Sequence, residues 1–300
     1  MKTLWRISHV SFAVRAGKAK PALIKKRDGK RAIEYLYGLN PISSALAGQK
    51  RQMYQLTLDE NKENEAHHRR HELAIKAQEL NLPVVYATQK KIEKLVRGQP
   101  HQGAVLECGP IKVNTIKSVD EIYERSGKIK GNTWVFLDQI TDPHNYGALA
   151  RSAFFYNVDG VFTTMTGSCP INSTVSKVST GAIELIDVYY LHNIERLMQK
   201  MAVRGWKILA TEAEETKAKK LIPLDEYIVN PDENVVVIFG SEGRGISSYL
   251  KRSATHRLSI RSGYLSEEFV YPVSLVDSLN VSVSAGIILN HFKKRIKKSQ

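Results

Sequence analysis

From Thr133 onward, short apolar runs alternate with segments of helical spacing, and this alternation limits the possible folds more than any other feature. Strands that alternate with helices form a mainly parallel sheet, whose ligands bind at the carboxyl ends of the strands. The sequence therefore predicts an α/β domain with its binding site on loops that follow strands. The expected strands are 133–138, 161–164, 185–190, 206–211 and 234–239, and the expected helices are 148–156, 172–183 and 193–203.

The stretch from Val273 to Asn290 is typical of a short strand, a polar turn with Ser278 and Asn280, and an apolar helix. Ser and Asn side chains can cap a helix, and the amides of its first turn can then meet an acceptor on a ligand. A plain helix cap would explain this turn equally well. Two further junctions of the same kind favour a ligand site.

The first of these junctions is the loop Gln139–Gly147, where Asp142 and Pro143 are typical of a helix start. On the helix that follows, Arg151 can face the same side as Asn145. The second is the glycine-rich loop Gly240–Ile246, which follows a strongly apolar strand. Its spacing, GxxGxG, matches neither the dinucleotide fingerprint nor a phosphate loop. A tight structural turn is the alternative interpretation of this loop.

The residues between Glu34 and Glu107 also alternate between strand and helix patterns, which predicts a small α/β domain. We expect a leader at 1–30, this small domain at 31–108, a linker at 109–131 and the larger domain at 132–297. A charged helix is expected at 60–80. Its histidines could suggest a metal, but the neighbouring charges favour a solvated face; they are His67, His68 and His71.

The chain carries 44 Lys and Arg against 30 Asp and Glu, a net charge of +14. This excess favours a polyanionic partner, nucleic acid first of all. The leader is basic and has no acidic residue before Asp28, as in a mitochondrial transit peptide or a basic arm that binds nucleic acid. No apolar run approaches the ~20 residues that cross a bilayer. Cys108 and Cys169 are too few for a disulfide framework and fit a reducing compartment.

Three segments resemble, in order and context, the motifs of the SpoU (TrmH) family of RNA ribose 2′-O-methyltransferases, in the SPOUT superfamily. They are Asp142-Pro143-His144-Asn145 with Arg151, Gly240-Ser241-Glu242-Gly243-Arg244-Gly245, and Ser278-Leu279-Asn280-Val281-Ser282. The resemblance covers about Thr133 to Phe292. The segments Tyr35–Pro41 and His101–Gly103 resemble the ends of the small RNA-binding domain that precedes the catalytic domain in many members. Within the family, the likeness is greatest to enzymes of the mitochondrial large ribosomal subunit.

The resemblance implies a sheet with a deep trefoil knot, a homodimer, and S-adenosylmethionine as the cofactor, with no metal. It also implies a guanosine of large-subunit ribosomal RNA as the acceptor. The cofactor pocket is expected at Gly240, Ile246, Ile260, Ser278, Leu279 and Asn280. This chain departs from the family pattern by the insertion Arg261–Val273 after the strand that ends at Ile260.

The residues that we expect to carry methyl transfer are Asn145, Arg151, Glu242, Ser278 and Asn280. Arg151 can hold a phosphate bidentately and order the ribose hydroxyl, although a guanidinium is a poor base. Glu242 can hold a neighbouring side chain, receive the proton, or form a surface ion pair. Asn145 and Asn280 can orient the ribose and the loop backbone. Ser278 is expected to cap the last helix and to touch the ligand.

Three functions therefore fit the sequence: a ribosomal RNA methyltransferase, a transfer RNA methyltransferase, or an RNA-binding assembly factor that retains the fold. The five polar residues favour an enzyme, because a binding factor would need none of them. The small domain and the leader favour mitochondrial ribosomal RNA over transfer RNA.

Overall fold

The computed structural model describes residues 32–61, 67–213, 221–262 and 278–293. The leader, most of the insertion 261–273 and the strand expected before Ser278 lie outside these residues. The trefoil knot that the family resemblance implies therefore stays a prediction.

A four-stranded sheet forms the first part of the described chain, with the order β1-β4-β2-β3. Strand β4 is antiparallel to β1 and β2, whereas β3 is parallel to β2. Leu36, Leu56 and Leu106 are fully buried at its core. Its elements are β1 (Glu34–Tyr37), α1 (Leu39–Gly48), β2 (Met53–Asp59), α2 (His67–Glu79), β3 (Val84–Ala87), α3 (Gln89–Leu95) and β4 (Ala104–Cys108).

The charged helix expected from residue 60 begins at His67 within the described residues. Glu60 and Asn61 are not helical, because the Asn61 N–H donates to the Asp59 side chain at 3.1 Å. Such a local bond offers the backbone an alternative to a helical turn.

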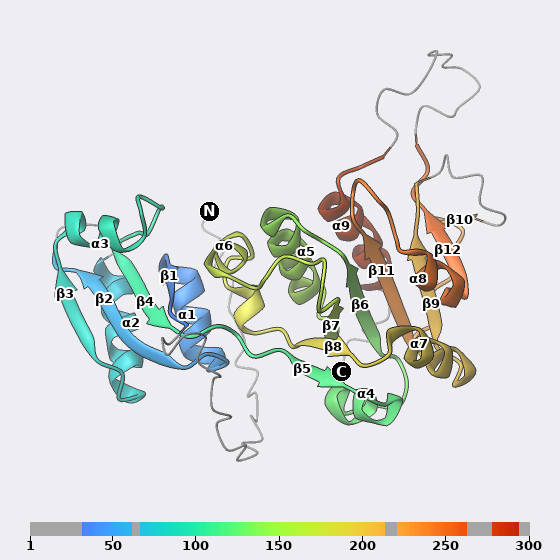
Figure 1. Ribbon diagram of the computed structural model, residues 1–300, viewed down its shortest axis with the longest axis horizontal. Helices are drawn as coiled ribbons and strands as arrows, with labels where there is room; N and C mark the ends of the chain where they lie inside the picture. The colour runs from blue at the N-terminus through green and yellow to red at the C-terminus, as the bar shows by residue number, and fades with distance from the viewer. Residues whose placement is uncertain (1–31, 62–66, 214–220, 263–277, 294–300) are drawn as a thin grey trace, which may run out of the picture. The chain divides into compact units, whose positions relative to one another are not determined.

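An eight-stranded sheet forms the larger part, with the order β10-β12-β9-β11-β6-β7-β8-β5 (Figure 1). Every pairing is parallel, which confirms the predicted sheet. The strands are β5 (Asn114–Ile116), β6 (Thr133–Asp138), β7 (Gly160–Thr163), β8 (Val188–Leu191), β9 (Lys207–Thr211), β10 (Leu221–Pro223), β11 (Val235–Gly240) and β12 (His256–Ser259). The two edge strands, β5 and β10, were not predicted, because three residues give too little periodicity. The segment 109–131, expected to be a linker, contains β5 and α4 (Val119–Ser126).

Helices cover both faces of the large sheet, and each face has its own apolar core. On one face lie α5 (Pro143–Phe155) and α9 (Val281–Phe292), which pack side by side (Figure 1). On the other lie α4, α7 (Ile194–Val203) and α8 (Ser248–Ser253). Two short helices, α6 (Ser173–Val178) and η1 (Ala182–Glu184), precede β8. Among the described helices, none is long and apolar enough to cross a membrane.

Helix α5 begins at Pro143, five residues before the expected start at 148. Asp142 caps it, as the sequence predicts, by accepting from the His144 N–H at 2.9 Å. The apolar spacing begins only after this polar first turn, which is why periodicity alone placed the start too late. Asn145 consequently lies in the first turn, at the carboxyl end of β6.

Candidate active site

Asn280 joins the three predicted junctions through its side chain. Its Nδ2 donates to Asn145 Oδ1 at 3.0 Å and to Glu242 Oε1 at 2.5 Å. The same Glu242 oxygen accepts from the Val281 N–H at 3.4 Å, at the first residue of α9. The N-terminus of a helix favours a negative charge, so this carboxylate is held where the backbone stabilises it. Residues far apart in the sequence thus form one hydrogen-bonded cluster.

Asn280, and not Ser278, caps helix α9. Its Oδ1 accepts from the Ser282 N–H at 2.9 Å and from the Ser282 hydroxyl at 2.6 Å. Ser278 lies two residues before the cap position and its side chain is exposed, so the expected capping by Ser278 is wrong. The reason is geometric: a cap residue must directly precede the first helical turn to reach its amides. The Asn280 side chain therefore performs two tasks, because its amide oxygen caps the helix while its nitrogen holds Asn145 and Glu242.

Glu242 is positioned by a loop that folds back on itself. The Gly245 N–H donates to the Ser241 carbonyl at 2.7 Å, and Gly245 has a φ of +65°, which favours glycine. A Cβ at Gly240 would lie 2.4 Å from the Gly245 carbonyl carbon. Side chains at these two positions would prevent the turn. Both glycines therefore have a structural role, and the turn places Glu242 beside α9.

Asp138 anchors the far end of this loop. It is the last residue of β6 and is fully buried. Its Oδ2 accepts from the backbone N–H of Ser247 at 2.7 Å and from the Ser247 hydroxyl at 2.5 Å. Ser247 is the N-cap residue of α8. The sequence analysis did not single out Asp138, because a lone carboxylate that ends an apolar strand gives no motif.

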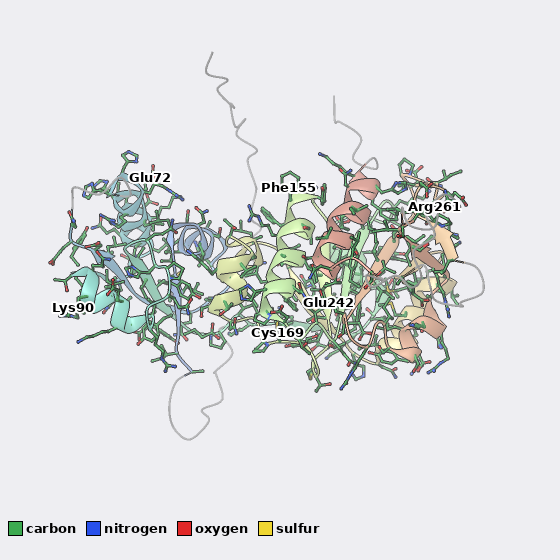
Figure 2. The ribbon with its side chains drawn as sticks, turned by 90° about the horizontal axis from the view of Figure 1, so that it is seen from above. Glu72, Lys90, Phe155, Cys169, Glu242 and Arg261 are labelled. Atoms are coloured by element: carbon green, nitrogen blue, oxygen red, sulfur yellow. The ribbon has the colours of Figure 1, made fainter. Side chains whose placement is uncertain are left out.

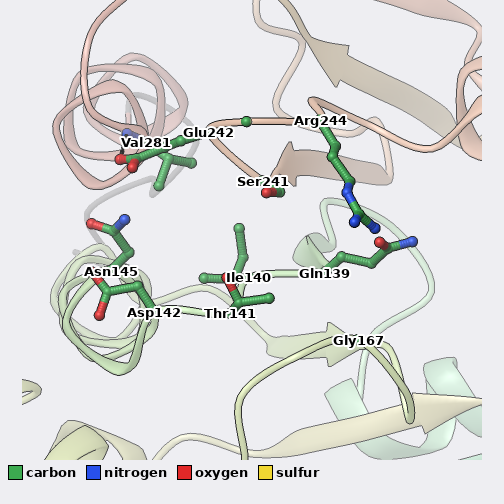
Figure 3. Close-up of a pocket in the computed structure, with 11 residues that line it drawn as sticks. Gln139, Ile140, Thr141, Asp142, Asn145, Gly167, Ser241, Glu242, Arg244 and Val281 are labelled. Carbon is green, nitrogen blue, oxygen red and sulfur yellow. Dashed lines mark hydrogen bonds between the residues drawn. The ribbon is translucent and has the colours of Figure 1, made fainter.

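A pocket of about 450 Å³ lies beside the cluster (Figure 3). Two predicted catalytic residues, Asn145 and Glu242, line it, and Asn280 is bonded to both. The residues that line the pocket are Gln139, Ile140, Thr141, Asp142, Asn145, Gly167, Ser241, Glu242, Gly243, Arg244 and Val281. Gln139, Gly167 and Arg244 were not predicted as functional residues. Arg244 was visible within the glycine-rich motif, whereas Gln139 and Gly167 gave no signal in the sequence.

Arg151 does not line this pocket. Its side chain is exposed on α5, one helical turn before Phe155, which is 73% exposed. The predicted arrangement, in which Arg151 shares a side with Asn145, is not visible as a contact between the described residues. Arg151 lies instead on the exposed face of the helix that also carries Phe155, which Figure 2 labels.

Two of the residues expected around a cofactor lie at the carboxyl ends of strands β11 and β12, which β9 separates in the sheet. Gly240 ends β11, Ile260 follows β12, and Leu279 precedes α9. Ile260 is half-buried and Leu279 is 48% exposed, so both offer apolar surface, whereas Ile246 is buried in the core on the face covered by α7 and α8. None of these residues lines the 450 Å³ pocket. That pocket lies instead at the carboxyl ends of β6, β7 and β11.

Cys169 is the thiol nearest to the pocket loops; its N–H donates to the Ile140 carbonyl at 2.9 Å. Burial, followed by the nearby charge of Asp142, raises the pKa of Cys169 to about 11. The thiol is therefore protonated at neutral pH and is a poor nucleophile. The described residues contain no group of three or more His, Cys, Asp or Glu side chains that could hold a metal ion.

Two family profiles match the chain. The profile described as "SpoU rRNA Methylase family" matches residues 132–290, and "RNA 2'-O ribose methyltransferase substrate binding" matches residues 35–113. Together they span the four-stranded sheet and all of the larger sheet except β5.

Curated relatives match most of the chain. The human "rRNA methyltransferase 1, mitochondrial" is 31% identical over 86% of this chain and 72% of the relative. A protein of the same name from Schizosaccharomyces pombe is 27% identical over 91% of this chain and 94% of the relative. The "23S rRNA (guanosine-2'-O-)-methyltransferase RlmB" of Pseudomonas aeruginosa is 30% identical over 85% of this chain and 94% of the relative.

Among solved structures, the AdoMet-bound rRNA methyltransferase from Sinorhizobium meliloti has the same fold. Its TM-score is 0.67 at 19% identity, and the match covers 91% of this chain and 90% of that one. The family profile alone spans more than half of the 300 residues. The family inferred from the three sequence motifs is therefore confirmed: the chain belongs to the SpoU rRNA methylase family.

Proposed function

We propose that this protein methylates the 2′-hydroxyl of a guanosine ribose in large-subunit ribosomal RNA of mitochondria, with S-adenosylmethionine as the methyl donor. The observation that carries the proposal is the cluster in which Asn280 holds both Asn145 and Glu242 at the edge of the pocket. An RNA-binding factor without catalysis would have no need for this arrangement.

The residues at the strand ends fit the cofactor. Leu279 and Ile260 offer apolar surface for an adenine ring, and the partly exposed Gly240 at the end of β11 offers backbone groups. When bound, S-adenosylmethionine supplies a methyl group on sulfur and a neutral sulfide as the leaving group. Related structures support this cofactor, because those from Sinorhizobium meliloti and Streptomyces viridochromogenes have AdoMet bound.

Glu242 is the group that we assign to receive the ribose proton. Its Oε1 is occupied by Asn280 and Val281, whereas its Oε2 has no hydrogen-bond partner within the part of the chain that the structure describes. With S-adenosylmethionine bound, Glu242 Oε2 would receive the hydroxyl proton of the ribose as the ribose oxygen takes the methyl group. Asn145, which is bonded to the same Asn280 side chain as Glu242, would orient the hydroxyl.

Arg151 requires a second copy of the chain to reach the acceptor. It lies on the exposed face of α5 with Phe155, and the adjacent helix α9 exposes Val283 and Ile287, four residues apart, to 50% and 41%. An apolar face of this kind fits a self-complementary dimer interface. We propose that a homodimer covers this face and that Arg151 there grips an RNA phosphate at the acceptor.

The substrate assignment is supported by the names of the relatives and by the charge. The human and fission yeast relatives are named as mitochondrial rRNA methyltransferases, and the Pseudomonas relative as an enzyme that acts on guanosine of 23S rRNA. A net charge of +14 fits a large RNA.

Mapping 2′-O-methyl groups in organellar and cytosolic RNA, with and without the protein, tests the proposal. We expect one guanosine of the organellar large-subunit RNA to lose its methyl group and to regain it with the wild-type chain. Glu242→Gln keeps an oxygen for Asn280 and Val281 but is a far weaker base, so it is expected to react about 10² to 10⁴ times more slowly. Glu195→Gln, an exposed carboxylate on α7, serves as the control. An unchanged methylation map with a deficit of assembled large subunits would support the RNA-binding factor instead.

A further inference from the structure

Two side chains without a partner face one another on the side of the pocket opposite Asn145. These are Gln139, which directly follows β6, and Arg244, which lies in the glycine-rich loop (Figure 3). Within the described residues, neither the Gln139 amide nor the Arg244 guanidinium has a hydrogen bond or an ion pair. The proposed methyl-transfer cluster uses neither of them.

The protein holds Gln139 in an unusual conformation. Its φ is +53°, which non-glycine residues adopt rarely, and its N–H donates to Thr164 Oγ1 at 3.4 Å. A Cβ at Gly167 would lie 3.2 Å from Gln139 Cγ, so this glycine lets the loop after β7 approach the Gln139 side chain. The loop therefore packs against Gln139 and directs its amide into the pocket.

No carboxylate of the described residues forms an ion pair with Arg244. The neighbouring Glu242 points to the other side of the pocket, where its Oε1 is bonded to Asn280 (Figure 3). The guanidinium instead points toward Gln139. The pocket thus separates a catalytic side, with Asn145 and Glu242, from a recognition side, with Arg244 and Gln139.

We infer that Arg244 and Gln139 read the guanine base of the nucleotide whose ribose is methylated. This inference rests on the proposed function and names the residues that select the base. A guanidinium can donate two parallel N–H bonds to the O6 and N7 atoms of guanine. The Gln139 amide oxygen can accept from the N1 and N2 hydrogens on the other edge of the base.

A base fits this side of the pocket better than a phosphate does. Two carboxylates, Asp142 and Glu242, line the same 450 Å³ and repel a phosphate, but not a neutral base. Ile140 and Val281 give the pocket apolar surface that can cover the face of a ring. The Gln139 amide oxygen beside the guanidinium also supplies a hydrogen-bond acceptor. Guanine has N–H groups that can donate to it, whereas an ionised phosphate has no donor.

Single-turnover methylation of an oligoribonucleotide that spans the mapped acceptor tests the inference. The acceptor is synthesised as guanosine, as 7-deazaguanosine, which lacks N7, or as inosine, which lacks the N2 amino group. The wild-type chain is expected to react roughly 10- to 100-fold more slowly with 7-deazaguanosine than with guanosine. The Arg244→Ala variant is expected to methylate guanosine slowly and to methylate 7-deazaguanosine at the same slow rate, because it no longer contacts N7.

Three variants sharpen the experiment. Arg244→Lys keeps the charge but not the bidentate geometry, and is expected to resemble Arg244→Ala in its insensitivity to N7. Gln139→Ala is expected to abolish the preference for guanosine over inosine. Arg252→Ala removes an exposed arginine of α8 that pairs with Glu195, and is expected to behave as wild type.

Two results would overturn the inference while methyl transfer stands. The first is a mapped acceptor other than guanosine. The second is that the rate loss from Arg244→Ala and the rate loss from 7-deazaguanosine multiply in full, which is expected if Arg244 contacts a phosphate and not N7. S-adenosylmethionine binding, measured by calorimetry in each variant, verifies that the loop is intact. Absence of methylation with every RNA, despite cofactor binding, would reject the proposed function itself and the inference with it.

Discussion

Asn280 Nδ2 donates to Glu242 Oε1 at 2.5 Å, which ties the start of the last helix to the glycine-rich loop. The same nitrogen reaches Asn145 at 3.0 Å, while the amide oxygen caps α9. One side chain thus links helix stability to the position of the carboxylate that we assign to proton removal.

Replacing Asn280 by Ala is expected to slow methyl transfer by about 10²-fold, because small displacements of a catalytic group have effects of that size. The loss of the cap is also expected to lower the free energy of unfolding by about 1 kcal/mol. Asn193→Ala removes the cap of α7, which lies outside the pocket lining, and provides the control. Methylation rates and urea unfolding of both variants separate the two effects. If Asn193→Ala is as inactive as Asn280→Ala, the loss reflects stability and not position.

Arg151→Ala is expected to abolish methylation while S-adenosylmethionine binding persists. The residue is exposed on α5 and lies outside the pocket lining, away from the strand ends where we expect the cofactor. Titration calorimetry gives the cofactor affinity, and radiolabelled methyl transfer gives the rate. Equal losses of binding and rate would contradict this division of roles.

The parallel sheet and its three functional loops could be predicted from the sequence, because apolar runs and cap residues are local signals. Strands β6 and β11 are long and almost fully buried, so their patterns are clear. The family resemblance predicts that Asn145, Glu242 and Asn280 meet in one site. Their bonds to one another confirm that these three residues meet, although their roles in catalysis stay predictions.

Other features depend on contacts that a sequence does not display. Asn280 rather than Ser278 caps α9, and both residue types cap helices equally well, so only the backbone geometry decides. The Gln139 conformation results from tertiary packing against the loop after β7. The short edge strands β5 and β10 form because neighbouring strands offer them hydrogen-bond partners. A strand of three residues is too short to show an alternating pattern in the sequence.

The apolar face shared by α5 and α9 predicts a dimer in solution. Phe155→Asp and Ile287→Asp each place a charge on this face, where Phe155 is 73% and Ile287 is 41% exposed. We expect both variants to be monomeric by light scattering and to lose methylation, because Arg151 would no longer reach the acceptor. Val203→Asp is the control, since Val203 is 89% exposed at the end of α7, on the other face of the sheet. A wild-type chain that is monomeric at micromolar concentration would exclude this interface.

His101 is expected to make stability fall in mild acid. Burial lowers its pKa from 6.5, and its Nδ1 accepts from the Gly103 N–H at 3.0 Å, which requires an unprotonated nitrogen. The unfolded chain then binds the proton more tightly than the folded one, so stability is complete above about pH 6.5 and decreases as the pH falls below it. Urea midpoints at pH 8 and pH 5.5 are expected to differ more for wild type than for His101→Gln. An equal difference in both proteins would assign the acid sensitivity to other groups.

Arg51 and Glu184 form an ion pair whose side chains are 0% and 1% exposed, with Nε 2.9 Å from Oε2. Glu34 and the Gly109 carbonyl also accept from the Arg51 guanidinium. Removing Glu184 leaves the buried Arg51 with only the partly exposed Glu34 to balance its charge, so Glu184→Ala is expected to cost about 3–5 kcal/mol of unfolding free energy.

Replacing both members of this pair gives the decisive comparison. The double variant Arg51→Met with Glu184→Leu removes both charges and keeps similar volume, and is expected to recover most of the lost stability. Glu195→Ala breaks the exposed pair with Arg252 and is expected to cost less than about 1 kcal/mol. These values come from urea unfolding at one pH and salt concentration. If the double variant is as unstable as Glu184→Ala, the loss of unfolding free energy comes mainly from packing around residue 184 and not from the charge of Arg51.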